Sequence, residues 1–483
     1  MLFNSLTFFA YFIVVFGIYW TLPSHRARLG VLLVASWLFY AAWHPAYLIL
    51  LLASSFGNHY LGLLVGKYRE TKPVLARRLV TATIVLNILP LMFYKYLDFA
   101  VTSLCGIASW TLGASLMPPH LALFLPLGIS FYTFEMVAYI VDIHRGECEP
   151  IRNPLKTSLF DTFFPRLIAG PIVRRNEFAP QLDSKRQFNG DQFLRGLDLI
   201  FIGLFKKVFI ADQLAPFVDK VFDQPTGVGS GALLLGVYAY AVQIYCDFSG
   251  YTDIGRGCAA CLGYELPINF SFPYFSCNIA DFWRRWHITL SSWLRDYLYI
   301  PLGGNRLGEV KTYRNLLLTM LLGGLWHGAS WCFVFWGVLH GAGLAVNRLV
   351  HQRRGLSAHE PLFAHPLYRL AAIICTFHFV CFGWIFFRAD SFAKAFTVVR
   401  GIASLRLLGA SDLTLFGATQ LGVVAAALAM LLAVHNLIQA ARRRGLQLHW
   451  AWQTARPLVF ASILAMVFLV AGRHPASFIY FQF

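Results

Sequence analysis

Residues 316–349 read LLLTMLLGGLWHGASWCFVFWGVLHGAGLAVNRL, an apolar run in which glycines are frequent and two histidines are embedded. A transmembrane helix needs about 20 mostly apolar residues, so this run is too long for one simple span. The sequence therefore predicts two shorter helices or a re-entrant pair at membrane depth. The interruptions fall at Gly323, Gly324, Gly328 and Gly337.

The rest of the chain has the same apolar character. Of its 483 residues, 58% are hydrophobic and 13% are charged, whereas a soluble domain carries about 25% charged residues. The apolar runs recur from end to end, so we expect an all-α polytopic membrane protein with about eleven transmembrane helices. The expected spans are Leu6–Trp20, Leu29–Trp43, Ala46–Val65, Leu79–Tyr96, Leu121–Ile143, Leu197–Phe217, Ala232–Phe248, Leu316–Leu349, Leu370–Phe387, Leu415–Ala440 and Pro457–Ala471.

The net charge of +17 comes from 40 lysines and arginines against 23 acidic residues. These cations lie in short clusters between apolar runs, which is the positive-inside pattern and disfavours a nucleic-acid partner. Arg26 and Arg28 follow the Leu6–Trp20 run, so we expect the N-terminus outside. That run has no cleavage pattern after it and is interpreted as a transmembrane helix. One span after the last cluster, Arg442–Arg444, places the tail Arg473–Phe483 outside as well.

The nine cysteines lie mostly inside apolar runs, where a thiol behaves as a small hydrophobic group. Cys258 and Cys261 form one CxxC pair without a second pair nearby, which is too sparse for a zinc or redox centre. We therefore expect no metal site.

Histidine is the first candidate for chemistry. His327 lies in Leu322-Gly-Gly-Leu-Trp-His-Gly-Ala-Ser330, an otherwise apolar stretch with glycines on both sides. A neutral imidazole is tolerated in such a place and can act as a base near pH 7. The flanking glycines let a substrate come close. The alternative is a histidine that only bonds a neighbouring helix, and that alternative is stronger for His340.

The segment 278–304 is the second candidate site. Its aromatic and aliphatic side chains form one stripe at about 100° per residue, so we expect an amphipathic helix at the cytoplasmic interface. Arg284 and Arg285 lie opposite the stripe and are suited to phosphates, or else anchor the helix to lipid headgroups. His287 falls at the edge of the stripe, directed away from bulk water. The stripe comprises Trp283, Trp286, Leu290, Trp293, Leu294 and Tyr297.

Acidic residues inside apolar runs form a third group. Asp247 and Asp253 lie at the end of the expected Ala232–Phe248 span. Such a pair suits either the orientation of a histidine or a polar network that fixes a broken helix, and we favour the network. Carboxylates at membrane depth need partners, or couple ions in a transporter. The same holds for two acids of an earlier span, Glu135 and Asp142.

The end of the chain, Phe478-Ile-Tyr-Phe-Gln-Phe483, is aromatic and uncharged. Such a tail is suited to anchoring at the membrane interface. A phenol on a short outer tail is also a possible acyl acceptor, which makes Tyr480 a candidate nucleophile.

Taken together, these segments resemble the membrane-bound O-acyltransferase family, and within it the membrane subunits of bacterial alginate O-acetylation systems. The resemblance covers nearly the whole chain, as one domain over residues 1–483, and several separate motifs agree in order and spacing. They are Leu127-Gly-Ile-Ser-Phe-Tyr-Thr-Phe-Glu135, Leu167-Ile-Ala-Gly-Pro171, Asp247-Phe-Ser-Gly-Tyr251, Phe282-Trp-Arg-Arg-Trp-His-Ile-Thr-Leu290, Leu294-Arg-Asp-Tyr-Leu-Tyr-Ile300, Leu325-Trp-His-Gly328 and Phe478–Phe483.

The resemblance implies an activity and a site. The family's essential histidine falls on His327 and its second polar position on His287, with Tyr480 as a candidate acyl relay. The implied fold surrounds a central tunnel with spanning, re-entrant and interfacial helices in the bacterial inner membrane. The implied donor is acetyl-CoA from the cytoplasm, used as a substrate and not as a bound cofactor. We expect substrate-binding side chains at Arg284, Arg285, Trp326, Asn278, Asp281, Asp247 and His340.

The resemblance also implies a partner and an acceptor. In related systems a periplasmic SGNH-type transferase receives the acetyl group and esterifies an exopolysaccharide such as alginate. Arg256 departs from the alginate-type pattern, so cellulose, peptidoglycan or another glycan stay open as acceptors.

Two other classes of protein remain as alternatives. A proton-coupled transporter or flippase would use the intramembrane acids and histidines, but the chain shows no internal repeat. A purely structural scaffold would tolerate alanine at His327 and His287 together.

Overall fold

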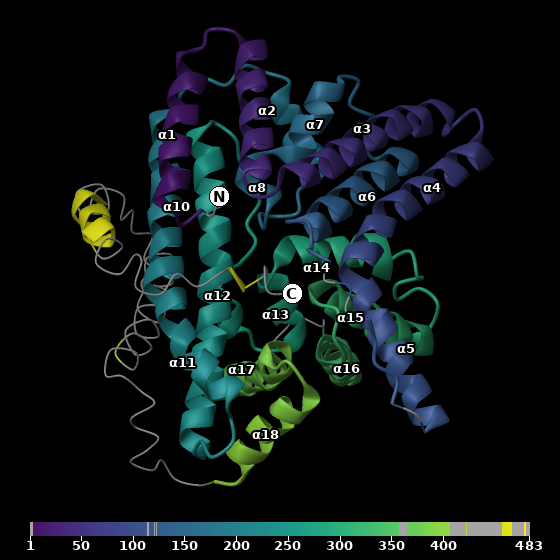
Figure 1. Cartoon of the computed structure of the whole chain (residues 1–483), viewed down its shortest axis with the longest axis vertical. Coiled ribbons are helices and arrows are strands. Elements are labelled where there is room, and N and C mark those ends of the chain that lie inside the picture. Colours follow the sequence, from purple (N-terminus) through teal and green to yellow (C-terminus); the bar gives the residue numbers. More distant parts are fainter. Residues whose placement is uncertain are drawn as a thin grey trace. The chain divides into compact units, whose positions relative to one another are not determined.

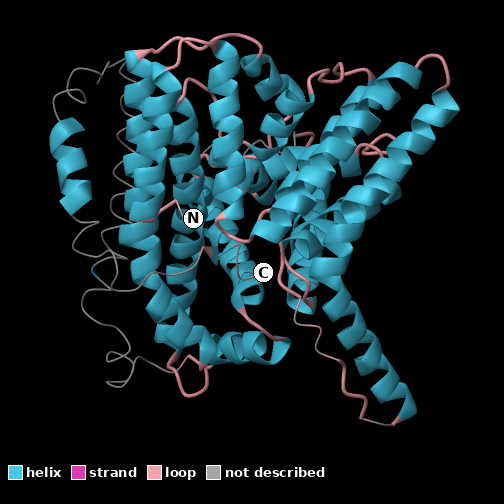
Figure 2. Ribbon diagram, turned by 45° about the horizontal axis from the view of Figure 1, so that its top comes forward, coloured by secondary structure: helices cyan, strands magenta, loops and turns pink. Residues whose placement is uncertain are grey.

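The computed structural model describes residues 3–113, 115–119, 121, 123–356, 365–405, 422, 456–465 and 478–479. Figure 1 and Figure 2 show that the regular elements in these ranges are helices, which confirms the expected all-α class for the described part of the chain. In chain order the α-helices are α1 (Leu6–Thr21), α2 (His25–Ala41), α3 (Pro45–Tyr68), α4 (Pro73–Leu91), α5 (Leu97–Leu112), α6 (Ile129–Arg145), α7 (Pro154–Thr162), α8 (Phe164–Leu167), α9 (Arg175–Phe178), α10 (Gly190–Leu204), α11 (Asp212–Asp223), α12 (Ser230–Cys261), α13 (Ile279–Arg285), α14 (Ile288–Leu294), α15 (Glu309–His327), α16 (Trp331–Arg353), α17 (Pro366–Arg388) and α18 (Phe392–Ala403).

Five helical stretches among the described residues are long and apolar enough to cross a membrane. They confirm a membrane protein with several spanning helices, while the expected number of about eleven is not confirmed. Two shorter apolar helices, Leu6–Thr21 and Arg456–Ala465, add to the apolar character. The five stretches are Pro45–Tyr68, Pro73–Leu112, Ser230–Cys261, Trp331–Arg353 and Pro366–Arg388.

Several expected spans differ from the helices found. The run Leu121–Ile143 becomes helical only at α6, because Pro126 lacks an N–H group and Gly128 has a left-handed backbone with φ +70°. A Cβ at Gly128 would lie 2.6 Å from the carbonyl oxygen of Leu167, so the position also requires glycine for space. The expected span Leu415–Ala440 lies outside the described residues except for Gly422, and Pro457–Ala471 is described only to Ala465.

The chain divides into two compact units. The first comprises residues 1–198, 255–267 and 328–330. The second comprises residues 199–254, 268–327 and 331–483, and it contains the described candidate site residues.

Several buried polar groups of the first unit bond to one another. Arg166 and Glu135 form a buried ion pair, and the backbone N–H of Val173 donates to Glu135 at 3.0 Å. On α3 and α4, the amides of Asn58 and Asn87 donate to each other, each at 2.9 Å. Ionisable groups at membrane depth require such partners, so the expectation for Glu135 is confirmed.

In the second unit, helices α15 and α16 confirm the expected division of the long apolar run into two. Glycines let their backbones approach closely, as is common in membrane helix pairs. A Cβ at Gly324 would lie 2.3 Å from the carbonyl oxygen of Phe333, and one at Gly337 would lie 2.3 Å from that of Met320. Alanine at either position would therefore force the two helices apart.

The sequence predicts one amphipathic helix over residues 278–304. The structure shows instead that this segment is broken into shorter helices. Helix α13 ends at Arg285, α14 begins at Ile288, and a π-helical turn covers Arg295–Tyr299. His287 lies in the break with φ +43° and ψ 55°, a left-handed conformation that is uncommon for a residue with a side chain. The expected division of side chains nevertheless holds for most of the stripe, since five of its members are buried: Trp283, Trp286, Leu290, Trp293 and Leu294.

Candidate active site

Three buried histidines lie in the second unit on different elements. His287 occupies the break between α13 and α14, His327 is the last residue of α15, and His340 lies inside α16. Their exposed fractions are 0%, 3% and 0%, respectively. The structure therefore places the three sequence-predicted histidines in the interior of the same unit.

Tryptophan rings connect the three histidines in series. The Trp326 ring centroid lies 5.9 Å from that of His287 and 5.0 Å from that of His327. The Trp336 ring centroid lies 5.1 Å from that of His327 and 4.6 Å from that of His340. His327 thus lies between two indoles, and the substrate-binding role of Trp326 stays a prediction. Trp336 was missed, because a tryptophan in an apolar run carries no sequence signal for a site.

The tautomer of His287 follows from its hydrogen bond to Asn269. The Asn269 Oδ1 atom accepts from the backbone N–H of Thr289 at 3.2 Å, which identifies this atom as the oxygen. His287 Nδ1 lies 3.2 Å from the same oxygen, so Nδ1 carries the proton and Nε2 is the acceptor atom of the ring. Burial lowers the pKa of His287 to about 3, which keeps the ring neutral. Asn269 has no sequence signal that points to this role, since it lies in the irregular connection before α13.

His340 is packed tightly among aromatic rings. The Trp283 indole N–H donates to His340 Nδ1 at 3.3 Å, so Nδ1 is unprotonated. A Cβ at Gly383 would lie 2.9 Å from His340 Nε2, which shows how closely α17 approaches this ring. These contacts suit a histidine that fixes the indole wall of the site.

The polar residues at the start of α13 bond to one another. Asn278 caps the helix by accepting from the backbone N–H of Asp281 at 2.8 Å. The Asp281 carboxylate accepts from the Arg284 guanidinium at 3.0 Å and from Arg285 Nε at 3.0 Å. The side chain of Arg284 is 53% exposed, so this cluster reaches the surface of the unit. A guanidinium has five donors, so neither arginine is exhausted by Asp281.

Asp247 lies in the middle of α12, which continues to Cys261, and not at a helix end as expected. Its carboxylate pairs with Lys207 Nζ at 2.5 Å and accepts the backbone N–H of Ile479 at 2.8 Å. Lys207 also pairs with Asp212 at 2.8 Å. The favoured polar network is therefore present, with the chain's C-terminal region as an unexpected member.

Aromatic contacts extend from this network to a histidine. Phe478 stacks on Tyr251 with centroids 4.4 Å apart, and it lies 5.9 Å from Phe248. The Phe248 ring in turn meets His287 edge-on at 4.8 Å. Tyr480, the expected relay, lies outside the described residues, although its neighbour Ile479 lies within them and is 4% exposed.

The described residues of the second unit line cavities, of which two are relevant here. One of about 460 Å³ is bounded by Trp283, Met320, Arg295, Asn347 and Arg348. The other, of about 490 Å³, is bounded in part by Asn278, Asn347 and His351. Volumes of this size are ordinary for small-molecule sites.

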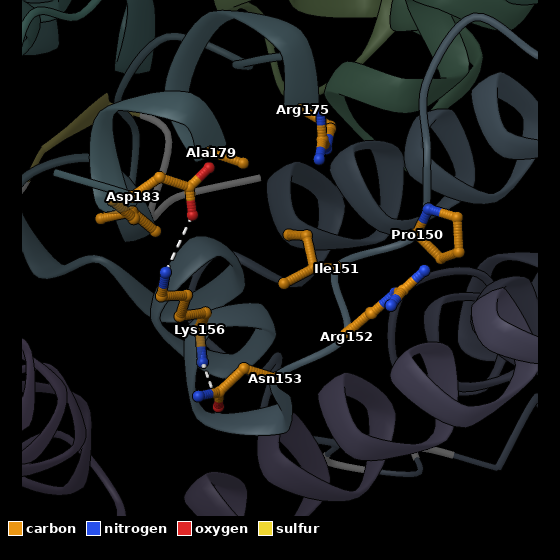
Figure 3. A pocket seen from close by; sticks show the side chains of 9 residues that line it. Pro150, Ile151, Arg152, Asn153, Lys156, Arg175, Ala179 and Asp183 are labelled. Atoms are coloured by element: carbon orange, nitrogen blue, oxygen red, sulfur yellow. Dashed lines mark hydrogen bonds and ion pairs between the residues drawn. The ribbon is translucent and has the colours of Figure 1, made fainter.

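The first unit contains a smaller cavity of about 210 Å³ with a basic lining (Figure 3). Arg152, Lys156 and Arg175 contribute to it, and Lys156 pairs with Asp183 at 2.8 Å. Among the described residues, no group of three or more histidine, cysteine or acidic side chains could hold a metal ion.

Comparison with known proteins identifies relatives over most of the chain. The pattern of the membrane-bound O-acyltransferase family (MBOAT) matches residues 151–388, which include the three histidines. The chain is 38% identical to "Probable alginate O-acetylase AlgI" of Pseudomonas putida over 100% of both chains. It is 40% identical to "Peptidoglycan O-acetyltransferase" of Helicobacter pylori, with 77% of this chain and 73% of that protein covered. "Teichoic acid D-alanyltransferase" of Bacillus subtilis is 32% identical, over 57% of this chain and 71% of that protein.

The family expected from the sequence motifs is thus confirmed, together with the enzyme class and the membrane character. The matched range includes both His327, at the end of α15, and the broken segment around His287. The chain belongs to the membrane-bound O-acyltransferase family and is an O-acyltransferase.

Proposed function

We propose that this chain takes an acetyl group from a cytoplasmic thioester and passes it across the bacterial inner membrane for O-acetylation of an extracytoplasmic polysaccharide. The observation that carries the proposal is the tail contact: Ile479, next to Tyr480, is bonded to Asp247 in the unit that holds His327. A buried base and an attached phenol are the two groups that acyl transfer needs. The relatives named for alginate and peptidoglycan O-acetylation support an acetyl group and a glycan.

Acetyl-CoA is the donor we propose. The cavity of about 460 Å³ is the place that we propose for its pantetheine arm, and the cavity lining includes Trp283, Arg295 and Arg348. Arg284 and Arg285 remain candidates for the phosphates, since guanidinium groups bind phosphate oxygens in pairs. Trp283 lies 5.7 Å from Trp336, which borders His327, so one further ring separates the cavity wall from the base.

The proposed chemistry begins with proton removal. His327 accepts the phenolic proton of Tyr480, and the phenolate oxygen attacks the thioester carbonyl. A C–O bond forms as the C–S bond breaks, and the thiolate leaves as CoA after taking up a proton. The product is an acetyl ester on the tail, from which a second transferase moves the acetyl group to the polymer.

His287 has a separate part in this scheme. Its Nε2 atom accepts hydrogen bonds because Asn269 fixes the proton on Nδ1. A neutral, oriented acceptor suits the positioning of a donor amide or of the attacking hydroxyl. Trp326, between His287 and His327, and His340, behind Trp336, shape the walls of the site.

The proposed orientation follows the charge pattern. The N-terminus and the tail lie on the outer side, and the basic clusters lie in the cytoplasm. A periplasmic SGNH-type transferase is the proposed partner that accepts the acetyl group, with alginate as the first polymer to test and cellulose or peptidoglycan as alternatives.

The central test is His327→Ala in the full chain. Loss of a general base should lower acetyl transfer by about 10²–10⁴-fold while the amount of protein in the membrane stays unchanged. His378→Ala is the matched control, because His378 is an exposed histidine of α17 in the same unit. Normal acetylation by the His327→Ala protein would refute the assignment.

A detergent assay separates the transferase from a transporter. With labelled acetyl-CoA, a transferase releases CoA in detergent micelles, whereas a proton-coupled transporter requires a sealed membrane. Release of CoA only in sealed vesicles would contradict the proposed function.

A further inference from the structure

Both end residues of the motif Asp247-Phe-Ser-Gly-Tyr251 on α12 contact the tail, Asp247 with its carboxylate and Tyr251 with its ring. Asp247 and Tyr251 are four residues apart, so they lie on the same face of the helix. Asp247 accepts the Ile479 N–H, and Tyr251 stacks on the Phe478 ring with an interplanar angle of 23°. One side chain thus holds the backbone of the tail, and the other holds its aromatic ring.

The carboxylate that binds the tail is itself fixed by a buried ion cluster. Asp247, Lys207 and Asp212 are 1%, 1% and 4% exposed. Lys207 pairs with both carboxylates, so one buried cation bridges two buried anions. Asp247 Oδ2 also accepts the backbone N–H of Ile479 at 2.8 Å. The tail therefore supplies a donor that the buried cluster uses.

Glycine makes the arrangement possible. A Cβ at Gly250 would lie 2.7 Å from the carbonyl oxygen of Gly203 and 3.1 Å from the backbone nitrogen of Lys207. The backbone contact at Gly203 is equally close, because a Cβ there would lie 2.5 Å from the carbonyl oxygen of Gly250. This close approach brings the backbone of Lys207 against α12, within reach of Asp247.

We propose that Asp247, Lys207, Asp212 and Tyr251 form a docking site for the C-terminal tail and hold its tyrosine at the place of acyl transfer. The inference rests on the proposed function, since it assigns these side chains as positioning residues for Tyr480. The docking site recognises a peptide of the pattern aromatic–aliphatic–tyrosine through one ring and one backbone N–H.

The decisive variant removes the donor from the tail and leaves the cluster intact. Ile479→Pro deletes the only N–H of that residue, whereas Ile479→Val keeps it and changes the side chain by one methylene. Neither substitution alters Lys207, Asp212 or Asp247, so the two ion pairs of the cluster keep their side chains.

Docking is measured without reference to catalysis. A photoreactive benzoylphenylalanine replaces Phe478 in the full-length chain in detergent, and mass spectrometry identifies its adduct. We expect the adduct on the α12 peptide that contains Tyr251, and we expect Ile479→Pro to reduce its yield about tenfold, as loss of a hydrogen bond to a charged acceptor implies. Ile479→Val should match the parent. An adduct elsewhere, or an undiminished yield in Ile479→Pro, would overturn the docking site.

Kinetics test the positioning role. With Phe478 unmodified, Ile479→Pro should lower kcat about tenfold and leave the KM for acetyl-CoA unchanged, because only the attached acceptor is displaced. An unchanged kcat would overturn that role. If the adduct forms on α12 but Tyr480 is never acetylated, docking is supported and the acyl relay of the proposed function is refuted.

Discussion

Two buried ion clusters offset the free-energy cost of burying charge with different kinds of partners. In the first unit, the Glu135–Arg166 pair receives the N–H of Val173, so its described bonds join residues within 38 positions of one another. In the second unit, Asp247 receives the N–H of Ile479, from 232 positions away. The backbone donor of the first cluster comes from a residue nearby in the sequence, and that of the second comes from the C-terminal tail.

This difference separates a structural pair from a docking site. Taking charges out of water costs free energy in both places, and each cluster recovers it through partners. Only the second of these two clusters has a described bond to the tail that we propose to be docked there. The Glu135–Arg166 pair is therefore expected to affect stability alone, and the Asp247 cluster to affect acyl transfer as well.

The largest expected effect is on the structural pair. Arg166→Met leaves Glu135 buried without its cation and should destabilise the protein by about 3–5 kcal/mol. The double variant Glu135→Leu with Arg166→Met should recover most of that loss, since no uncompensated charge remains. Unfolding by SDS in mixed micelles measures both. Equal stability of the single variant and the parent protein would contradict the structural assignment.

A pH titration should give the next largest effect. The pKa of His287 is lowered to about 3 by burial, and the ring's ordinary pKa is about 6.5. Between these values the unfolded chain binds more protons than the folded chain, so stability falls as pH falls. From pH 6.5 to pH 5 the expected loss from this residue is about 2 kcal/mol. His287→Gln should remove that part of the slope, and an unaltered slope would refute a buried neutral ring.

The smallest expected effect is on the orientation of His287. Asn269→Ala removes the acceptor that fixes the proton on Nδ1, and loss of one neutral hydrogen bond corresponds to about a fivefold decrease in kcat. Asn269→Asp should instead raise the pKa of His287, because a carboxylate stabilises the charged ring. Ring titration by NMR on labelled histidine distinguishes these variants. A tautomer unchanged in Asn269→Ala would show that other contacts orient the ring.

The amino-acid sequence predicted the parts of the site that are local in the chain. Composition and periodicity predict the division into α15 and α16 and the burial of most of the Trp283 stripe. The catalytic role of His327 in its glycine-rich run stays a prediction. Glu135 was expected to need a partner and has one. Such features depend on neighbouring residues and on the cost of polar groups in an apolar environment.

The parts that the sequence did not reveal depend on contacts between distant segments. Lys207 and Asn269 gain their roles from Asp247 and His287, which helical periodicity does not link to them. The break at His287 was missed because its flanking residues continue a helical pattern, while the backbone there is left-handed. Asp247 was assigned to a helix end because the apolar run stops there, although α12 continues through the polar residues that tertiary bonds satisfy.

The central claim is that the tail beside Asp247 carries the acetyl group that His327 helps to transfer. Mass spectrometry of the tail peptide from cells supplied with labelled acetate tests this claim most directly. The account predicts a labelled acetyl ester on Tyr480 in the parent protein and its loss in His327→Ala. An unlabelled tail in cells that acetylate their polysaccharide normally, together with full activity of Tyr480→Phe, would contradict it.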